Sequence, residues 1–419
     1  MPEIARAGAL RALPARRIIA HIADAAQRWC NADYPPRVRA TAAIEERLGY
    51  STPVVDYALD RLFGAVTREA LEATIVAELG SVDALDGVAR AAWARGVDRV
   101  VIVSSDTTIG VAMIPALFAL CAKSDVVVKD RSDALVANFF SSLAEEHPAF
   151  AHGAHARTWA GGDDAGEDAL FAQADVVVAF GTDETLRALR ARCGVDTRFV
   201  PFGHRVSIGR LTREDAAALN EDLDAALADR ITRDALLYDG EGCLSLHALF
   251  VEAADEPRSS GVSGSELLRG VGGALAAACE RVAVEFPASR WSPQRSAAVA
   301  AYRNLAAFRA ASGSGAVFRG GDATIVVDPP HDKPPPLLPR VLPLIAVADD
   351  DALAAYAGAQ RLPVQAIGVV RADARAVALA ERIGAVRVAP FGTMQDPPLG
   401  GHHGGAPRIA DFVRWIDCA

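Results

Sequence analysis

Short runs rich in valine and isoleucine alternate with Ala-rich stretches along most of this 419-residue chain. The earlier runs are VDRVVIVSS (97–105), SDVVVK (124–129), ADVVVAFG (174–181) and TRFVPFG (197–203). The later runs are HALFVEA (247–253), RVAVEF (281–286), ATIVVD (323–328), VLPLIAV (341–347), AIGVV (366–370) and AVRVAPF (385–391). This alternation predicts strands joined by helices, and therefore an α/β fold with mostly parallel sheets.

The length of the chain predicts more than one hydrophobic core. We expect two α/β halves that meet near residues 233–240, without an internal repeat. The predicted division is a first domain at 1–235, a second at 236–395 and a C-terminal segment at 396–419. The Pro-rich DPPHDKPPPLLPR (328–340) cannot be a central strand or a helix interior, so it is predicted to be a surface connection.

Composition limits the possible partners. Hydrophobic residues make up 51% and charged residues 23%, the balance of a soluble globular protein. The net charge of −10 and the pI near 5.4 argue against nucleic-acid binding, because a phosphate backbone requires a basic surface. Small molecules or protein partners are expected instead.

The cysteines are dispersed, without a CxxC pair, at positions 30, 121, 193, 243, 279 and 418. This pattern indicates neither a disulfide framework nor a zinc site, and it fits a reducing compartment such as the cytoplasm. The longest uncharged apolar run, 109–122, is too short to cross a bilayer and predicts a buried helix. The Arg-containing N-terminus lacks the apolar core of a signal peptide, so an ordinary helix is expected there.

Cys243 is the most informative of these cysteines, because it lies in DGEGCLSLHALFVE (239–252) directly after Gly242. No GxGxxG, GxxxxGK[ST], HExxH or GxSxG pattern offers another fingerprint. Glycines permit unusual dihedrals and leave a thiol accessible to substrate. A helix after Cys243 would stabilise the thiolate with its free amides and would place His247 on the same face. The alternatives are a small buried cysteine and a structural histidine.

Two segments resemble one known family. GEGCLS followed by HALFVE resembles the nucleophile segment of the LuxC-type fatty acyl-CoA reductases, a branch of the aldehyde dehydrogenase superfamily. FGTMQDPPLGGHHGGAPRIADFVRWID (391–417) resembles the C-terminal signature of that family, which precedes a terminal helix. Weaker similarity to the superfamily extends from about residue 97, so the first part of the chain is unassigned.

The resemblance implies an aldehyde-dehydrogenase-like fold of two Rossmann-like domains with parallel-sheet cores. It also implies that 1–235 binds the cofactor, that 236–395 is catalytic, and that Cys243 is the nucleophile. In the cofactor domain, the resemblance assigns Lys129, with Arg131 nearby, and the pair Gly181 and Thr182 to cofactor contact. A solvated lysine and a helix N-cap at Thr182 are the structural alternatives for these residues.

Several positions depart from the superfamily pattern. Pro201 stands where aldehyde-oxidising members have a water-activating glutamate, which suits a reductase. Pro336 or Leu337 stands in place of a ribose-binding glutamate. SSDTTIG (104–110) lacks the asparagine that would hold an oxyanion, and Thr107 or Thr108 is the candidate substitute. Gly404 replaces the aspartate expected after His403.

The expected activity is reduction of an acyl-CoA, implied to be fatty, to the aldehyde with NADPH through an acyl-Cys243 thioester. The alternatives are an acyl-phosphate reductase of the γ-glutamyl phosphate type and an inactive scaffold that binds CoA esters or a partner. No metal site is expected, because the histidine pairs 152/155 and 402/403 lack carboxylate or thiolate neighbours. The resemblance implies a homodimer formed through the strands that follow Pro339.

Overall fold

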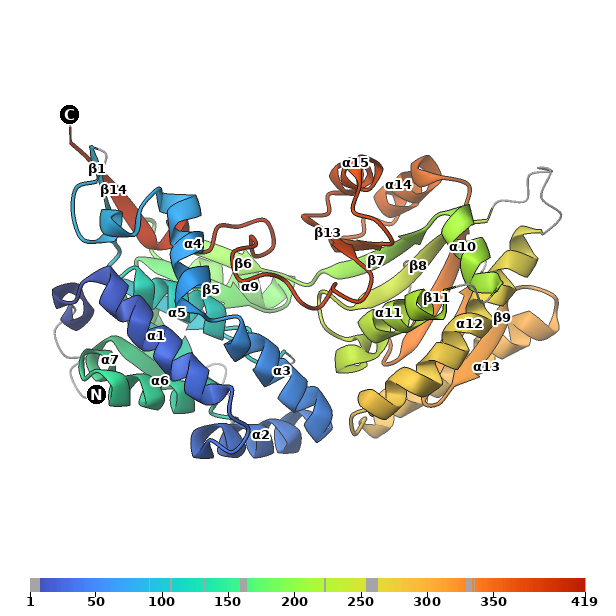
Figure 1. The fold of residues 1–419 in the computed structure, drawn as a ribbon, viewed down its shortest axis with the longest axis horizontal. Helices are drawn as coiled ribbons and strands as arrows, with labels where there is room; N and C mark the ends of the chain where they lie inside the picture. The colour runs from blue at the N-terminus through green and yellow to red at the C-terminus, as the bar shows by residue number, and fades with distance from the viewer. Residues whose placement is uncertain are drawn as a thin grey trace. The chain divides into compact units, whose positions relative to one another are not determined.

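The structure is a computed structural model that describes residues 8–89, 91–105, 108–130, 133–158, 164–221, 224–253, 263–328, 334 and 336–418. Its backbone divides into two compact units. The first contains residues up to 48, then 55–204, and 398 to the C-terminus, and the second contains 49–54 and 205–397. Each unit has its own parallel sheet, as the alternation of strands and helices predicts, and each is described separately below (Figure 1).

A five-stranded parallel sheet forms the core of the first unit, in the order β4-β3-β2-β5-β6. Its strands are β2 (Arg99–Val103), β3 (Asp125–Lys129), β4 (Ala154–Arg157), β5 (Val176–Phe180) and β6 (Arg198–Phe202). The central strands are almost entirely valine and isoleucine, and they are buried because helices cover both faces of the sheet. Four of the predicted runs therefore become strands of one sheet.

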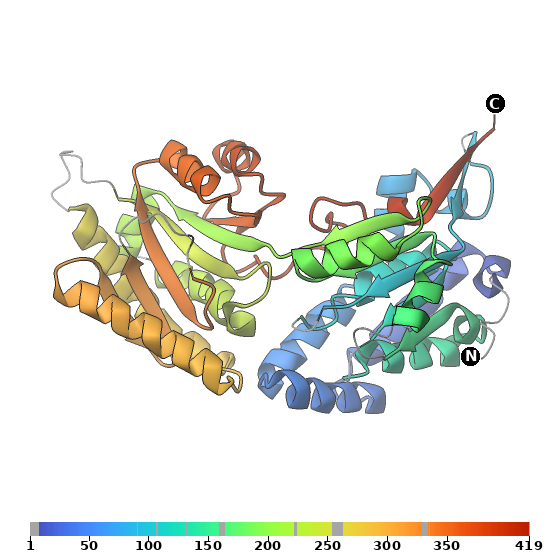
Figure 2. The same ribbon diagram turned by 180° about the vertical axis from the view of Figure 1, so that it is seen from behind.

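Helices α8 and α9 cover one face of this sheet, where Phe171 and Leu186 pack with Val101, Val127 and Val177. Helix α5, with α1 and α6 beside it, contacts the opposite side (Figures 1 and 2). The predicted buried helix at 109–122 is confirmed as α5. The α-helices are α1 (Ala15–Trp29), α2 (Pro35–Leu48), α3 (Thr52–Gly64), α4 (Arg68–Leu79), α5 (Met113–Cys121), α6 (Leu135–Glu146), α7 (Ala149–Gly153), α8 (Asp164–Phe171) and α9 (Asp183–Arg192), and the short 3₁₀ helices are η1 (Ala9–Ala12) and η2 (Val82–Leu85).

The C-terminal segment returns to this unit and ends as a strand. After η4 (Ala410–Phe412), β14 (Val413–Asp417) pairs antiparallel with β1 (Ala92–Gly96) in a two-stranded sheet. Glu78 holds the approach to this strand, because its carboxylate accepts the amides of Arg408, Ile409 and Ala410. The terminal helix implied by the family resemblance is therefore wrong, since pairing with β1 selects extended backbone.

The second unit contains a seven-stranded sheet in the order β13-β12-β7-β8-β11-β10-β9. All neighbours are parallel except β9, which runs antiparallel to β10. The strands are β7 (Val206–Leu211), β8 (Leu246–Glu252), β9 (Ala316–Gly320), β10 (Ala323–Asp328), β11 (Val341–Val347), β12 (Val364–Val369) and β13 (Arg387–Pro390). The remaining predicted runs are confirmed as strands, with one exception described below.

Helices lie on both faces of this second sheet (Figure 1). On one face, Leu353 of α14 and Leu379 of α15 pack with Ile208, Phe250 and Ile367. On the other face, α13 packs on β10 and β11, and α12 contacts α10 and α11. The helices are α10 (Arg213–Asn220), α11 (Ala225–Leu236), the 3₁₀ helix η3 (Leu237–Gly240), α12 (Gly264–Glu285), α13 (Pro293–Ala311), α14 (Asp350–Ala359) and α15 (Ala374–Ile383).

Two predictions differ from these elements. The run RVAVEF (281–286) is the last turn of α12 and the residue after it, not a strand, because a Ser263 capping box starts a 22-residue helix that buries Leu267, Val271, Leu275 and Val282. The compact units divide after His204, whereas the predicted division lies at 235/236. Strand β7 pairs with β8 and β12, so the residues after 204 belong to the second sheet.

No helix among the described residues is long and apolar enough to cross a membrane. Residues 336–338 of the Pro-rich connection lie outside helices and strands, and most of the residues before them lie outside the described ranges.

Candidate active site

Cys243 lies in a tight turn between η3 and the buried strand β8. The Ser245 amide donates to the Gly242 carbonyl oxygen at 2.9 Å, and the Gly242 amide donates to Ser245 Oγ at 3.0 Å. These bonds close residues 242–245, which we call the cysteine turn. Cys243 is exposed, whereas Ser245 and the first residues of β8 are buried. The turn therefore exposes the thiol of Cys243, while the residues that follow it in the chain are buried.

The chain enters the cysteine turn through left-handed backbone. Tyr238, Asp239 and Gly240 have φ angles of 55°, 55° and 73°. Glycine accepts this region freely, but other residues lose roughly 1–2 kcal/mol each. A Cβ on Gly240 would also lie 2.7 Å from the Ala235 carbonyl oxygen. Gly240 is therefore required by both its dihedral angles and the close approach of the backbone.

A buried ion pair holds this strained segment. Arg340 Nε donates to Asp239 Oδ1 at 2.7 Å, and both side chains are almost fully buried. Asp239 Oδ2 accepts from Trp291 Nε1 at 3.0 Å and from the Ser289 amide at 3.2 Å. Removing one partner of such a pair leaves a buried charge without compensation. The pair therefore stabilises the left-handed backbone next to the cysteine.

Two further side chains hold the turn from other elements. Ser207 Oγ, on β7, donates to the Cys243 carbonyl oxygen at 2.7 Å. Gln395 Nε2 donates to Ser245 Oγ at 2.7 Å and to the Leu237 carbonyl oxygen at 3.1 Å. Gln395 belongs to the FGTMQ segment, and Ser245 belongs to GEGCLS. The structure thus brings together the two segments, 150 residues apart, that carry the family resemblance.

Asp234 is a buried residue of this site that the sequence analysis missed. Its carboxylate accepts the Gly392 amide at 2.6 Å and the Met394 amide at 3.2 Å. Burial raises the pKa of Asp234 to about 7, although both amide hydrogen bonds lower it. The contacts fasten the FGTMQ segment to the end of α11. Because the partners are backbone amides, the sequence carried no signal for them.

The environment of Cys243 does not by itself favour the thiolate. Although the residue exposes surface, the protein packed around it raises the pKa of the thiol by desolvation. Backbone hydrogen bonds from Cys243 and Leu244 act in the opposite sense and lower that pKa. The amides that stabilise sulfur come from the turn itself. The turn is followed by β8, as predicted from HALFVEA (247–253), and not by the helix considered as a source of free amides.

His247 is a buried residue of β8 and does not share a helix face with Cys243. The ladder between β7 and β8 shifts register here, because Ser207 pairs with Leu246 and Ile208 pairs with Ala248. His247 Nδ1 accepts the Ser207 amide at 3.0 Å. Nδ1 also lies 3.2 Å from the Ser207 carbonyl oxygen, but the fixed direction of the amide proton makes Nδ1 the acceptor. In the neutral ring, the proton therefore resides on Nε2.

In the first unit, the residues predicted to bind the cofactor gather at one edge of the sheet. Lys129 ends β3, and Gly181 and Thr182 follow β5. Thr108, one of the two candidates for the oxyanion donor, follows β2, which lies between those two strands. Carboxyl ends of adjacent parallel strands, where the crossovers change direction, form the usual ligand crevice of such sheets. Thr107 and Arg131 lie outside the described residues, so their side chains are not placed.

Lys129 is ion-paired within this edge. Its Nζ lies 2.8 Å from Oε1 of Glu167, a buried residue of α8 that also pairs with Arg192. Glu167 carried no signal in the sequence, because it is distant from Lys129 in the chain and follows a segment without a strand pattern. The positive charge predicted for this edge is therefore partly balanced by a carboxylate.

Thr182 caps helix α9. Its Oγ1 accepts the Thr185 amide at 3.3 Å, and Asp183 and Glu184 occupy the first turn. The capping role offered as an alternative is thus present. This cap does not exclude an anion, because the Thr182 side chain satisfies only one of the free amides at the N-terminus of α9. A Cβ on Gly181 would lie 3.2 Å from Thr185 Cγ2, so this position is also close-packed.

Beside this edge, His403 stacks on the aromatic residues that end two strands. Its ring centroid is 4.1 Å from that of Phe202 and 5.5 Å from that of Phe180. Burial lowers the pKa of His403 to about 3, and Arg408 lowers it further. The ring is therefore neutral at physiological pH. Within the described ranges, no cluster of histidine, cysteine and carboxylate side chains could hold a metal ion.

The structure places three of the positions that depart from the superfamily pattern, and each has the backbone or the exposure that is usual for its residue type. Pro201 lies in β6 and pairs with Ala179 of β5. Leu337 is exposed in the Pro-rich connection, and Gly404 has a φ of 58°, which glycine adopts without strain.

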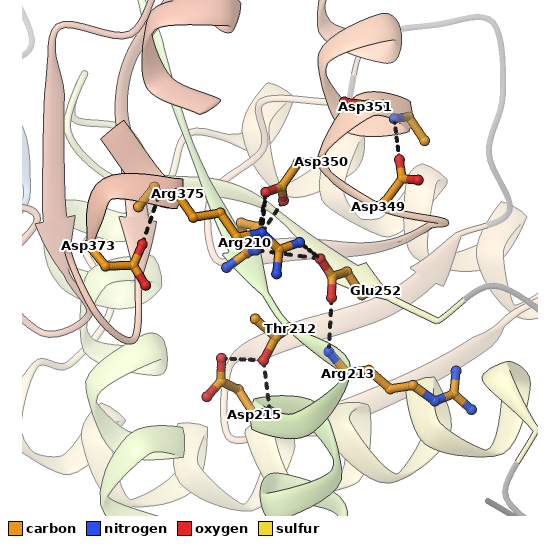
Figure 3. A network of polar contacts seen from close by, with 12 residues as sticks. Arg210, Thr212, Arg213, Asp215, Glu252, Asp349, Asp350, Asp351, Asp373 and Arg375 are labelled. Atoms are coloured by element: carbon orange, nitrogen blue, oxygen red, sulfur yellow. Dashed lines mark hydrogen bonds and ion pairs between the residues drawn. The ribbon is translucent and has the colours of Figure 1, made fainter. Parts of the chain in front are cut away.

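A network of charged residues lies at the other end of β8 (Figure 3). Arg210 Nε donates to Asp350 at 2.9 Å, and Arg210 also pairs with Glu252, the last residue of β8. Arg375 pairs with the same two carboxylates. Cys243 lies just before the first residue of β8, and Glu252 is its last residue. The seven residues of the strand therefore separate the network from the thiol by about 20 Å. We assign it a structural role.

Comparison with known proteins agrees with this architecture. Three solved structures resemble the fold: an NAD-dependent benzaldehyde dehydrogenase from Corynebacterium glutamicum (15% identity, 97% of this chain and 86% of that chain, TM-score 0.67), an NAD-dependent aldehyde dehydrogenase from Burkholderia multivorans (15%, 97% and 80%, 0.67), and the glyceraldehyde-3-phosphate dehydrogenase GapN from Methanocaldococcus jannaschii, complexed with NADP (12%, 97% and 90%, 0.66). At these identities the likeness establishes the fold alone. No curated protein matches the sequence.

The sequence matches one family over nearly its whole length. That family is described as Acyl-CoA reductase (LuxC), and the match covers residues 10–415. The match includes the cysteine turn, the FGTMQ segment that contacts it and the parallel sheets of both units. The protein is therefore a member of the LuxC family of acyl-CoA reductases, aldehyde-forming oxidoreductases that act on acyl thioesters, built on the aldehyde dehydrogenase fold.

Proposed function

We propose that the protein reduces a fatty acyl-CoA to the aldehyde with NADPH, through a thioester formed on Cys243. The observation that carries this proposal is the cysteine turn. It exposes one thiol, supplies two amides to its sulfur, and lies in the segment that resembles the nucleophile segment of the family. The fatty acyl group follows from the family resemblance.

The first chemical step occurs at Cys243 Sγ. The thiolate attacks the thioester carbonyl carbon, the carbon–sulfur bond to CoA breaks, and CoA leaves as a thiol after gaining the proton lost by Cys243. The raised pKa of this thiol means that most of it is protonated before substrate binds. The amides of Cys243 and Leu244 favour negative charge on sulfur, and we infer that they also stabilise the oxyanion on the attacked carbon.

The acyl-enzyme should then persist. Pro201 stands where oxidising members of the superfamily have a water-activating glutamate, so this position supplies no base for hydrolysis. His247 is the proposed proton donor to Cys243 Sγ, which takes up one proton when the carbon–sulfur bond breaks and the aldehyde leaves. Because Nδ1 accepts the Ser207 amide, the neutral ring would offer the Nε2 hydrogen to the departing sulfur as a hydrogen bond, and water would replace the proton that sulfur gains.

The carboxyl edge of the first sheet fits a nicotinamide dinucleotide. Lys129 provides a cation, and the N-terminus of α9 after Gly181 provides amides that suit a pyrophosphate. Asp183 and Glu184 oppose tight binding of phosphate at that end. NADPH bound here would supply the hydride that reduces the acyl carbon to the aldehyde. Arg131 is a further proposed contact of the cofactor, and Thr107 is the proposed side-chain donor to the oxyanion.

Preference for NADPH over NADH follows from charge at this edge. Lys129 and the neighbouring Arg131 favour an added phosphate, and the Glu167 carboxylate reduces that effect. Lys129→Ala should therefore lower kcat/KM for NADPH more than for NADH. An unchanged ratio between the two cofactors would contradict the assignment.

We also propose a homodimer in the cytoplasm. Strand β14 pairs only with β1 among the described strands, and Trp415 and Ile416 expose 48% and 42% of their surface. An open strand edge with exposed apolar residues is suited to pairing with a second chain. Strand β14 follows Pro339 in the chain, so it is among the strands proposed to pair between the two subunits.

Intact-mass spectrometry tests the central claim. Acyl-CoA added without NADPH should add one acyl mass, peptide mapping should place it on 239–252, and NADPH should release it as aldehyde. Cys243→Ala should lose both loading and reduction. Cys418→Ala is the matched control, because Cys418 is the other exposed cysteine among the described residues. An adduct on another cysteine, or reduction by the Cys243→Ala protein, would refute the mechanism.

A further inference from the structure

We propose that Gln395 is a positioning residue for Cys243, which acts through Ser245 to hold the cysteine turn in its reactive conformation. This inference rests on the proposed role of Cys243 as nucleophile. Gln395 lies in the FGTMQ segment, whose function the family resemblance does not define. Its carboxamide bonds directly to the turn.

Ser245 is the link between Gln395 and the cysteine. Its hydroxyl oxygen accepts two hydrogen bonds, from the Gly242 amide at 3.0 Å and from Gln395 Nε2 at 2.7 Å. Gly242 and Ser245 flank Cys243 and Leu244 in the chain. The direction of the two amides that act on the cysteine sulfur therefore depends on a hydroxyl that Gln395 orients.

The carboxamide itself has one favourable orientation. Nε2 also lies 3.1 Å from the Leu237 carbonyl oxygen and 3.3 Å from the Asp234 carbonyl oxygen, so the nitrogen must face this group of acceptors. Oε1 then faces Gly242, where a Cβ would lie only 3.2 Å from it. The side chain is thus in close contact with both ends of the turn.

The FGTMQ segment that carries Gln395 is itself fixed. Asp234 accepts the amides of Gly392 and Met394, and Met394 is fully buried. The carboxamide therefore approaches the turn from a rigid support. A positioning group must be held in this way, because an error of about 1 Å at a reacting atom can cost on the order of 100-fold in rate.

Alkylation of Cys243 by iodoacetamide tests the proposal without acyl-CoA or NADPH. Peptide mapping would give the rate at 239–252 across a range of pH. Gln395→Ala should slow alkylation about ten-fold and shift its pH profile upward, because the amides no longer face the sulfur. Gln395→Glu, which keeps the shape but lacks the donor, should be impaired at least as much.

A double-mutant cycle identifies the path of the effect. Ser245→Ala should slow alkylation by itself, and adding Gln395→Ala to it should cost less than two-fold more, because the link is already lost. Wild-type reactivity of either single variant would overturn the proposal. So would an equal effect of Gln395→Ala in both backgrounds. If Gln395→Ala does not fold, the Ser245→Ala result decides the question.

Arg210→Met is the control for lost stability. It breaks the charged network at the far end of β8 (Figure 3) and leaves the cysteine turn intact. It should unfold more easily but alkylate at the wild-type rate. Equal slowing in Arg210→Met would show that reactivity follows stability, and would overturn the proposal. If alkylation behaves as predicted but acyl-CoA is not reduced, the proposed function fails while the positioning role stands.

Discussion

Replacing Asp234 by asparagine should change how the stability of the protein depends on pH. Asp234 is 1% exposed, and burial raises its pKa from 3.8 to about 7. Asparagine cannot ionise and has the shape of the protonated acid; its Nδ2 cannot accept an amide, which costs the variant one of the two hydrogen bonds by the same amount at every pH. The variant therefore resembles the wild-type protein with Asp234 permanently neutral.

The sign follows from proton binding in the two states. Between pH 3.8 and about 7, folded Asp234 holds a proton that the unfolded chain has lost. The stability that this group contributes is fully present below pH 3.8 and is lost as the pH rises to its folded pKa. At about 1.4 kcal/mol per pH unit, the total loss is about 4 kcal/mol. Asp234→Asn should avoid this loss.

Denaturant unfolding of both proteins from pH 4 to pH 8 measures the effect. The free energy of unfolding of Asp234→Asn, minus that of the wild type, should rise by about 4 kcal/mol between pH 4 and pH 7, and then level off. In this difference, the contributions of the other titrating groups to the free energy of unfolding cancel, because both proteins contain them. A difference that stays constant would show that Asp234 is ionised in the folded protein, and that its two amide bonds outweigh burial.

Three further outcomes are expected. Gly240→Ala should lower the free energy of unfolding by at least 2 kcal/mol and suppress acylation, whereas the control Gly358→Ala, in a helix with open space at its Cβ, should be neutral or slightly stabilising in the same unfolding assay. Arg210→Met should lower the free energy of unfolding by about 3 kcal/mol and leave kcat/KM for acyl-CoA unchanged. A loss of activity per folded molecule would contradict its structural role. Trp415→Glu should convert the proposed dimer to a monomer in light scattering, and a wild-type protein that is already monomeric would refute the proposed interface.

The sheets could be predicted because buried parallel strands have a distinctive composition. Runs such as DVVVK and VVVAF are too short and too β-branched to be helices, and they became β3 and β5. RVAVEF has a similar composition but was misassigned. It continues an apolar pattern with helical spacing that begins at Leu267, so the longer pattern, not the local run, decides the structure.

The site was predicted only in part, because the residues that hold the cysteine turn in place are distant from it in the sequence. Cys243 could be found from its segment. The Asp239–Arg340 pair joins residues 101 apart, and Ser207 reaches the Cys243 carbonyl oxygen from another strand. Single charged residues that pair across such distances leave no periodic pattern in the sequence, so the sequence alone could not identify them. His247 was linked to Cys243 by helical spacing, whereas a register shift in β8 gives its ring a different partner.

The two glycines around Glu241 have the properties that the sequence predicted, and the structure adds which groups they allow to come close. The sequence predicted unusual dihedrals and an accessible thiol at these positions, and Cys243 is exposed. In the structure, Gly240 permits left-handed backbone beside the Ala235 carbonyl, and Gly242 permits the Gln395 carboxamide to approach the turn. Both glycines allow other groups to come close to the backbone of the turn. Substitution at either should therefore alter the reactivity of Cys243 by moving its amides, although the thiol itself would remain exposed.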